Sequence, residues 1–293
     1  MNILHALEGR ERDLGDGFTV RRLLPASACR SVGPFIFFDH LGPLDVAAGV
    51  RHDVRPHPHI GLATVTYLFE GAITHRDSLG HVQRIEPGAI NWMTAGRGIV
   101  HSERTPDDMQ GQARRMHGLQ LWCALPATDE ECDPAFAHYP ASGMPEVREG
   151  DVGVRVLVGE LHGSRSPVET MLETLYLDVT LAPGAAWHVP AVVAERALYC
   201  IQGEVALDGL PLPAHRLVVL KEGASPVLAS VDGARVVVVG GEALPEPRYM
   251  WWNLVSSRRE RIQQAAADWE SRRFAPIPGD DEERIPLPES RFA

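Results

Sequence analysis

The chain contains almost no lysine and lacks any long apolar run. Lys221 is the single lysine among its 293 residues, so arginine supplies nearly all of the 28 basic side chains, against 39 acidic ones and a net charge of −11. A phosphate backbone repels a protein with this charge, so we expect no direct binding to nucleic acid. No apolar segment approaches the ~18 residues of a membrane-spanning helix, and charged residues interrupt the first stretch between Glu8 and Asp13. We therefore expect neither a membrane span nor a signal peptide.

Cysteine is also scarce and widely spaced. The four cysteines, Cys29, Cys123, Cys132 and Cys200, form no C-x-x-C pair, a pattern typical of free thiols in a reducing compartment. We therefore expect a cytoplasmic protein. Hydrophobic residues make up 44% of the chain and charged residues 23%, values that are typical of a folded globular protein with a sizeable core.

Short β-type runs dominate the sequence between Phe18 and about Gly241. β-Branched and aromatic residues cluster in runs such as 63–69 and 236–239, and turn residues such as the Glu-Pro-Gly at 86–88 separate them. The runs recur at the ~8–12-residue spacing of a β-sandwich or barrel. We therefore predict an all-β fold with an antiparallel core.

One helix is predicted near the C-terminus. Ser257 and Glu260 match the S-x-x-E capping box, and apolar residues follow at helical spacing from Ile262 to Trp269, which predicts a short helix that buries one face. The segment 274–288 then contains four prolines and an acidic cluster. Because proline prevents a continuing helix, we expect an extended tail over the surface, either as a strap or as a frayed end.

A faint internal repeat divides the chain into halves. Residues 67–71 are Tyr-Leu-Phe-Glu-Gly and residues 199–203 are Tyr-Cys-Ile-Gln-Gly, an offset of about 130 residues. Two copies of one β unit fit this offset, with prolines and acidic residues interrupting the strand pattern between them. We expect one domain over 1–130 and a second over 131–293, the second including the C-terminal helix and tail.

Two short histidine motifs carry the candidate chemistry. His57 and His59 form an H-x-H motif, and His101 and Glu103 form an H-x-E motif about 40 residues later. Side chains two apart on a strand share a face, so three imidazoles and one carboxylate converge if the two strands meet inside a barrel. An H-x-H triplet alone is a weak signal. The combination with H-x-E and a Gly-Arg-Gly turn at 96–98 is far more specific.

The two motifs lie within longer segments at 57–71 and 92–103, and two more segments, at 252–257 and 278–288, complete a recognisable pattern. Together the segments closely resemble the pirin family of the cupin superfamily, and the resemblance covers nearly the whole chain. It implies a bicupin with two antiparallel β-barrel (jelly-roll) domains and one mononuclear metal, usually iron, in the N-terminal barrel. The four metal ligands of the family carry over onto His57, His59, His101 and Glu103.

The donor set agrees with this implication on chemical grounds. Imidazole suits iron, zinc, copper and nickel, whereas a closed structural zinc site would more typically include cysteine. Four protein ligands on an octahedral ion leave about two positions for substrate, dioxygen or water. The ligand residues alone do not distinguish Fe from Mn, Ni or Cu as the bound metal. The family resemblance implies Fe(II).

The second copy of the repeat shows no comparable motif. Aligning Gly203 with Gly71 places only His188 near the position of His57, and no histidine follows two residues later. We therefore expect a metal-free second barrel. The other histidines of the first half are expected as surface or hydrogen-bonded core residues, with His75 and Asp77 on an outer hairpin.

The pirin resemblance implies two classes of function. The first is a quercetinase, which opens the central ring of a flavonol with O2 and releases carbon monoxide. The second is a regulator whose iron, by changing oxidation state, alters binding to a transcription factor or metabolic enzyme. Cupins usually place a glutamate four residues after the second histidine of H-x-H, where this chain has Ala63. Glu103 is then expected to serve as both ligand and catalytic base, with slow turnover.

Overall fold

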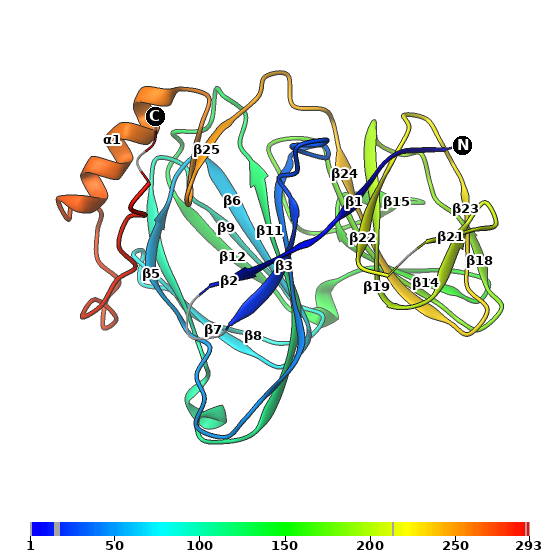
Figure 1. Ribbon diagram of the computed structural model, residues 1–293, viewed down its shortest axis with the longest axis horizontal. Coiled ribbons are helices and arrows are strands. Elements are labelled where there is room, and N and C mark those ends of the chain that lie inside the picture. The colour runs from blue at the N-terminus through cyan, green and yellow to red at the C-terminus, as the bar shows by residue number, and fades with distance from the viewer. Residues whose placement is uncertain (1, 15–17, 213, 291, 293) are drawn as a thin grey trace. The chain divides into compact units, whose positions relative to one another are not determined.

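The computed structural model describes residues 2–14, 18–212, 214–290 and 292, and β-strands dominate it (Figure 1). The chain forms two compact units, each built from separate segments. Unit 1 comprises Met1–Glu11, Arg21–Asp39 and Ser142–Leu244, and unit 2 comprises Arg12–Val20, His40–Ala141 and Pro245–Ala293.

Two sheets build unit 2, which contains the histidine motifs. A seven-stranded sheet has the order β12-β9-β6-β11-β4-β3-β2, and a four-stranded sheet has the order β5-β10-β7-β8. Strands β2, β3 and β4 belong in part to unit 1. The bounds in the large sheet are β2 (Arg10–Asp13), β3 (Thr19–Leu24), β4 (Phe35–Val46), β6 (Leu62–Glu70), β9 (Ile90–Thr94), β11 (Arg114–Ala124) and β12 (Ala135–Tyr139). Those in the small sheet are β5 (Val54–His59), β7 (Ile73–Asp77), β8 (Val82–Ile85) and β10 (Ile99–Arg104), and the 3-10 turn η1 (Asp107–Met109) follows.

Unit 1 repeats this arrangement around an apolar interior. Its seven-stranded sheet has the order β1-β22-β19-β24-β17-β14-β13, and its four-stranded sheet has the order β18-β23-β20-β21. Alternating valines and leucines of these strands bury one continuous hydrophobic cluster, as expected of strands with one face in a core. The bounds in the large sheet are β1 (Ile3–Glu8), β13 (Glu146–Glu149), β14 (Val152–Val158), β17 (Thr174–Leu181), β19 (Glu195–Gly203), β22 (Arg216–Leu220) and β24 (Ala234–Gly241). The remaining elements are β15 (Glu160–Leu161), β16 (Ser164–Arg165), β18 (Ala186–His188), β20 (Val205–Leu207), β21 (Leu210–Leu212), β23 (Val227–Ala229) and the 3-10 turn η2 (Ala141–Gly143).

The internal repeat corresponds to equivalent strands. Strand β6 lies between β9 and β11, and β19 lies between β22 and β24, so each repeat segment occupies an inner position of its seven-stranded sheet. Gly71 follows β6 with φ of 86° and Gly203 ends β19 with φ of 82°. Only glycine adopts this left-handed conformation without a steric penalty, so both copies keep glycine at the same turn.

The C-terminal helix forms where the apolar spacing predicts it, but its cap differs. Helix α1 (Arg259–Glu270) buries Ile262, Ala265 and Trp269. The predicted capping box is wrong, because Arg258 is the N-cap and makes no side-chain cap. The Ser257 hydroxyl instead donates to the buried carboxylate of Glu130 at 2.9 Å. The backbone N–H of Ser257 also donates to Glu130, at 2.8 Å, so this carboxylate holds Ser257 just before the helix.

Each end of the chain belongs to the unit formed mainly by the other half of the sequence. Strand β1 pairs with β22 in unit 1. The hairpin of β25 (Tyr249–Trp251) and β26 (Leu254–Ser256), helix α1 and the tail all belong to unit 2. The compact units therefore differ from a continuous division at residues 130 and 131, because backbone pairing with a distant strand outweighs proximity along the chain.

The four cysteines are free, as their spacing predicts. Two are buried and two are half-buried. Among the residues that the structure describes, no helix is both long enough and apolar enough to cross a bilayer.

Candidate metal centre

The histidine motifs lie on neighbouring antiparallel strands. His101 of β10 is opposite His57 of β5, and Ile99 is opposite His59. The register shifts between His101 and Glu103, so that Glu103 is opposite Val54. Such a bulge inserts an extra residue into one strand and changes the direction of nearby side chains. All three imidazoles are buried.

The three imidazoles form one tight cluster. The ring centroids of His57 and His101 lie 4.4 Å apart, and the His59 ring lies 5.0 Å from each of the other two. The Nε2 atoms of His59 and His101 are 3.1 Å apart, and one ring nitrogen from each of the three residues lies within 4.8 Å of the others. Two nitrogens bound at right angles to one ion, each at ~2.1 Å, would lie ~3 Å apart. The spacing therefore fits a shared metal ion.

Backbone carbonyls fix two of the rings in the metal-binding tautomer. His57 Nδ1 is 2.8 Å from the Arg55 carbonyl, and His59 Nδ1 is 3.1 Å from the Asn253 carbonyl. A carbonyl only accepts, so both Nδ1 atoms donate and both Nε2 atoms keep a free lone pair. The Nδ1 of His101 is buried without a hydrogen-bond partner. The Nε2 lone pairs of His57 and His59 are the atoms that a metal ion at the cluster would use.

Burial keeps the cluster neutral. The pKa of His57 is lowered to about 4, chiefly by loss of solvation; the hydrogen bond to the Arg55 carbonyl opposes this shift, and the nearby His75 adds to it. Burial and the neighbouring imidazoles also hold the pKa values of His59 and His101 well below their usual range. Neutral imidazole is the form that binds metals. The site is therefore ready to bind a cation at neutral pH without first losing protons from histidine.

Lowering the pH should destabilise the metal-free protein between about pH 6.5 and pH 4. The unfolded chain binds a proton at His57 in this window and the folded chain does not, because the folded pKa is about 4 instead of 6.5. The free energy of unfolding then falls with decreasing pH by ~1.4 kcal/mol per pH unit and proton, or about 3 kcal/mol for His57 across the window. Denaturant titrations of chelator-treated protein measure this slope.

His57→Gln should reduce the slope of the free energy of unfolding against pH by the contribution of one proton. His188→Gln should leave this slope unchanged. Glu103 acts in the opposite direction, because its folded pKa of about 7 lies above the ordinary 4.5. The folded carboxyl group stays protonated in the same window, which offsets one proton of the uptake on unfolding. The net fall in stability then comes from His59 and His101, whose folded pKa values also lie well below the ordinary value. A slope that does not respond to His57→Gln would contradict the assignment of a neutral, buried His57.

Glu103 lies inside unit 2 but outside the tight cluster. The Thr66 hydroxyl is 3.5 Å from Glu103 Oε1 and donates to Gln120 Oε1 at 2.8 Å. Burial raises the pKa of Glu103 to about 7, and the Thr66 contact only partly offsets this. The group of atoms within 4.8 Å of one another contains the three histidines and not this carboxylate. Coordination by Glu103 therefore stays a prediction.

Ala63 does not face the cluster. Residues alternate faces along β6, so Ala63 lies on the opposite face from Thr64 and Thr66. Thr66 contacts Glu103, and Thr64 is paired with Trp122, whose ring packs edge-on against His59 at 5.1 Å. The residue of β6 on the inward face at this level is Thr64.

His75 and Asp77 are buried next to the cluster, and their expected place on an outer hairpin is wrong. The His75 ring lies 5.4 Å from the His101 ring, and its Nε2 is 2.9 Å from Asp77 Oδ2. Strand β7 pairs with β10, which brings the hairpin against the metal strand. The H-x-D spacing, which matches that of the other two motifs, is the signal that could have identified them. Trp122 carries no comparable motif.

The remaining histidines have other roles. His40 and His117 are buried, with their Nε2 atoms 2.9 Å apart in a hydrogen bond. His188 is exposed at the end of β18. Over the described ranges of the chain, the three clustered histidines are the one group with metal-ligand geometry.

Comparisons with known proteins agree with the fold. The Pirin family profile matches residues 17–123, and the Pirin C-terminal cupin domain matches residues 176–275. A pirin-like protein of Caulobacter vibrioides is 44% identical over 286 residues, which cover 96% of this chain and 98% of that protein. A pirin-like protein of Solanum lycopersicum is 36% identical over 267 residues, which cover 89% and 88%.

Among solved structures, quercetin 2,3-dioxygenase from Acinetobacter baumannii superimposes with a TM-score of 0.90 at 34% identity, covering 99% of this chain and 97% of that one. The predicted all-β fold with two cupin barrels and one short C-terminal helix is confirmed. With both cupin domains matched and nearly the full length aligned, the chain belongs to the pirin family of the cupin superfamily.

Proposed function

We propose that the protein is a metal-dependent dioxygenase of the quercetinase type, which cleaves flavonols with O2. One observation carries the proposal: three buried, neutral imidazoles converge, with the Nδ1 atoms of two of them committed to backbone carbonyls. The similarity to a solved quercetin 2,3-dioxygenase over almost the whole chain supports the choice of reaction.

His57, His59 and His101 would hold the metal, with Glu103 as the fourth ligand. A set of histidine and carboxylate ligands without cysteine suits Fe(II) and other divalent transition metals. Among these metals we propose Fe(II), because the pirin resemblance implies iron. The bound ion would supply Lewis acidity toward the 3-hydroxyl oxygen of the flavonol and a site for dioxygen beside it. Holding both reactants in one buried place lowers the entropic part of the barrier.

Glu103 is the residue proposed to move the proton. A pKa of about 7 in the metal-free protein suits a general base that works near neutral pH. The carboxylate would accept the proton of the flavonol 3-hydroxyl, and the Thr66 hydroxyl lies 3.5 Å from its Oε1. One flavonol and one O2 then give one ring-opened depside and one carbon monoxide.

Oxygen consumption by the Fe(II)-loaded protein tests the proposal. Anaerobically loaded protein mixed with quercetin and air-saturated buffer should consume one O2 and release one carbon monoxide per flavonol. Chelator-treated protein and the same amount of free iron serve as controls. If loaded protein consumes no O2 above free iron with any flavonol, the enzymatic proposal is rejected. The alternative would then be the regulatory role, in which the oxidation state of the iron alters binding to a transcription factor or metabolic enzyme.

A further inference from the structure

The C-terminal segment of unit 2 contacts the two strands that carry the proposed ligands. The first contact is the hairpin of β25 and β26. Its Asn253 carbonyl accepts the hydrogen of His59 Nδ1 at 3.1 Å. Leu254 pairs in parallel with Ile60, and Val255 N donates to the Ile60 carbonyl at 3.3 Å. The hairpin therefore fixes the ring of His59 directly.

The packing at this hairpin leaves no space for adjustment. Gly61 follows Ile60 with φ of 68°, and a Cβ atom added there would lie 2.1 Å from the Val255 carbonyl oxygen. Both the left-handed backbone and the close approach require glycine. The position of the Asn253 carbonyl relative to His59 is thus set by a direct backbone contact.

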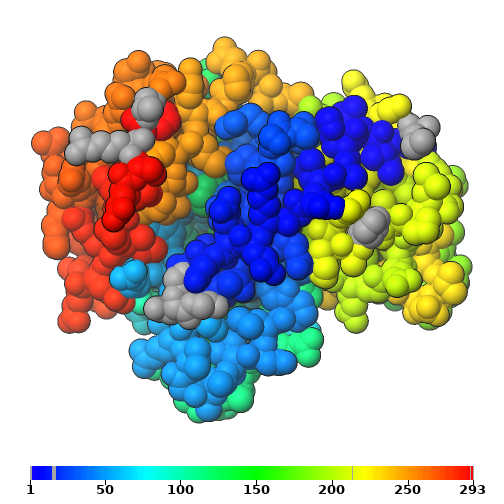
Figure 2. Space-filling model, viewed as in Figure 1, coloured from blue at the N-terminus to red at the C-terminus, as the bar shows by residue number. Residues whose placement is uncertain are grey.

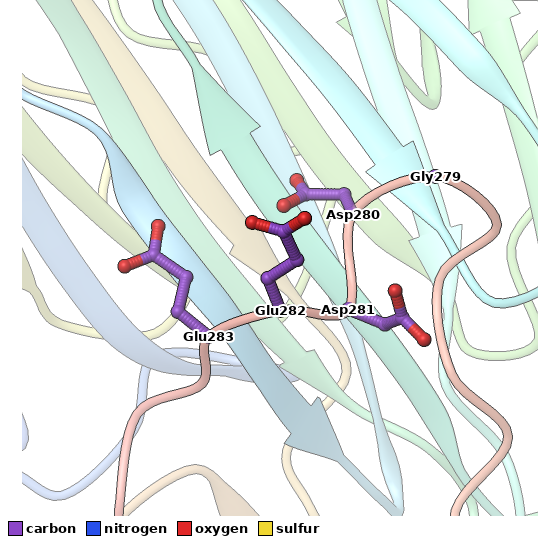
Figure 3. Close-up of a pocket in the computed structure, with 5 residues that line it drawn as sticks. All are labelled: Gly279, Asp280, Asp281, Glu282 and Glu283. Atoms are coloured by element: carbon purple, nitrogen blue, oxygen red, sulfur yellow. The ribbon is translucent and has the colours of Figure 1, made fainter.

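The second contact is made by Asp280 on the outer face of β10. Its Oδ2 accepts from the Ser102 hydroxyl at 2.6 Å and from Arg104 Nε at 2.9 Å, and its Oδ1 accepts from Arg104 Nη2 at 2.5 Å. Figure 3 shows Asp280 and Asp281 pointing in different directions from the tail. Ser102 and Arg104 flank Glu103 in sequence, and Ser102 follows His101. One carboxylate therefore holds the strand from the face opposite the proposed ligands.

Asp280 is charged at neutral pH. Although burial raises the pKa of its carboxyl group, the hydrogen bonds from Arg104 and Ser102 outweigh that effect and lower the pKa below its usual value. Glu283 also pairs with Arg104, at 3.0 Å. A charge-assisted bidentate pair of this kind, with only 17% and 13% of the two side chains exposed, is far less screened than a surface ion pair.

The third contact lies on β5. Ile285 N donates to the Pro56 carbonyl at 2.9 Å, directly before His57, and the Ile285 carbonyl accepts from Trp269 Nε1 of α1 at 3.0 Å. The buried Trp269 and Ile277 also pack against Val100 of β10. Figure 1 shows this tail passing beside β5, and Figure 2 shows it next to α1 on the surface. The tail is therefore a strap and not a frayed end.

We propose that the segment from Pro245 to Ile285 is a positioning element of the metal centre, with Asp280 as its anchor on β10. Each contact falls on a residue next to a proposed ligand, or on a ligand itself. Because successive side chains of a strand point to opposite faces of one shared backbone, fixing Ser102 and Arg104 on one face also fixes the direction of His101 and Glu103 on the other. Metal affinity depends on sub-ångström placement of ligands by such outer contacts. The inference rests on metal binding from the proposed function, and it does not require flavonol turnover.

Asp280→Asn tests the inference, with Asp281→Asn as a matched control on the neighbouring exposed residue. The probe is Co(II), whose visible absorption reports ligand geometry and whose affinity is measured by competition with a chelator. Asp280→Asn should raise the Kd for Co(II) about tenfold and change the absorption bands. Asp281→Asn should change the Kd less than about twofold, and Asp280→Glu should recover part of the affinity. Ser102→Ala combined with Asp280→Asn should cost less than the sum of the two single effects.

The outcomes separate this inference from the proposed function. If wild-type protein binds one Co(II) and Asp280→Asn binds it with the same Kd and spectrum, the positioning role is overturned and metal binding stands. A lower melting temperature of metal-free Asp280→Asn with unchanged affinity also overturns it, because the contact is then structural only. If wild-type protein binds no Co(II), both proposals are rejected.

Discussion

Replacing His101 with alanine should reduce the bound metal from about one ion per chain to less than about a tenth of that amount. The His101 ring lies against both of the other imidazoles, and its Nε2 is 3.1 Å from that of His59. Without it, two imidazoles remain and the cluster loses its shared geometry. Metal content after gel filtration, measured by mass spectrometry, gives the ratio directly, and circular dichroism checks that the variant is folded.

The matched control is His188→Ala. His188 is an exposed histidine at the end of β18 in unit 1, so its removal should leave the metal content near one. Retention of metal by His101→Ala, or a second tightly bound ion in the wild-type protein, would show that the cluster is not the site.

The substitution Glu103→Gln should lower flavonol turnover per bound metal by ~10²-fold or more, the usual range for loss of a general base. The amide keeps the size of the side chain and its contact with Thr66, but it cannot accept the proton of the flavonol 3-hydroxyl. Metal retention should also fall if the carboxylate is a ligand, because an amide oxygen donates less charge to the ion. Oxygen uptake divided by the metal content of each sample separates the two effects.

The comparison variant is Glu86→Gln, which makes the same chemical change at an exposed residue after β8 whose partner is Arg84. Turnover should be unaffected there. If Glu103→Gln binds metal normally and turns over flavonol at the wild-type rate, Glu103 is not the base, and another group near the cluster accepts the proton.

The histidine cluster could be predicted from sequence because it depends on local spacing. His57 and His59 share a face of β5, and β10 places His101 directly opposite His57. The period of two in an extended chain places His57 and His59 on one face. The pairing of β10 with β5 does not follow from this period, and it was implied by the family resemblance. The apolar face of α1 follows from the helical period in the same way.

The neighbours of the cluster could not be predicted in this way. The sequence pattern places His75 on an outer hairpin, yet β7 pairs with β10 and brings its ring to 5.4 Å from that of His101. A local pattern does not state which strand lies next to which. Placing Ala63 at the position of the usual cupin glutamate likewise requires its side chain to point inward. A shift of one residue along a strand moves a side chain to the opposite face.

Sequence by itself therefore determined the strand-rich fold, the two related halves, the free cysteines and the set of clustered histidines. Tertiary structure alone decided that the C-terminal segment lies in unit 2, that Asn253 orients His59, and that Ser257 binds Glu130 instead of capping α1. The reason is physical. Side-chain periodicity is fixed over a few residues, whereas these contacts join residues more than 100 positions apart and depend on the register of paired strands.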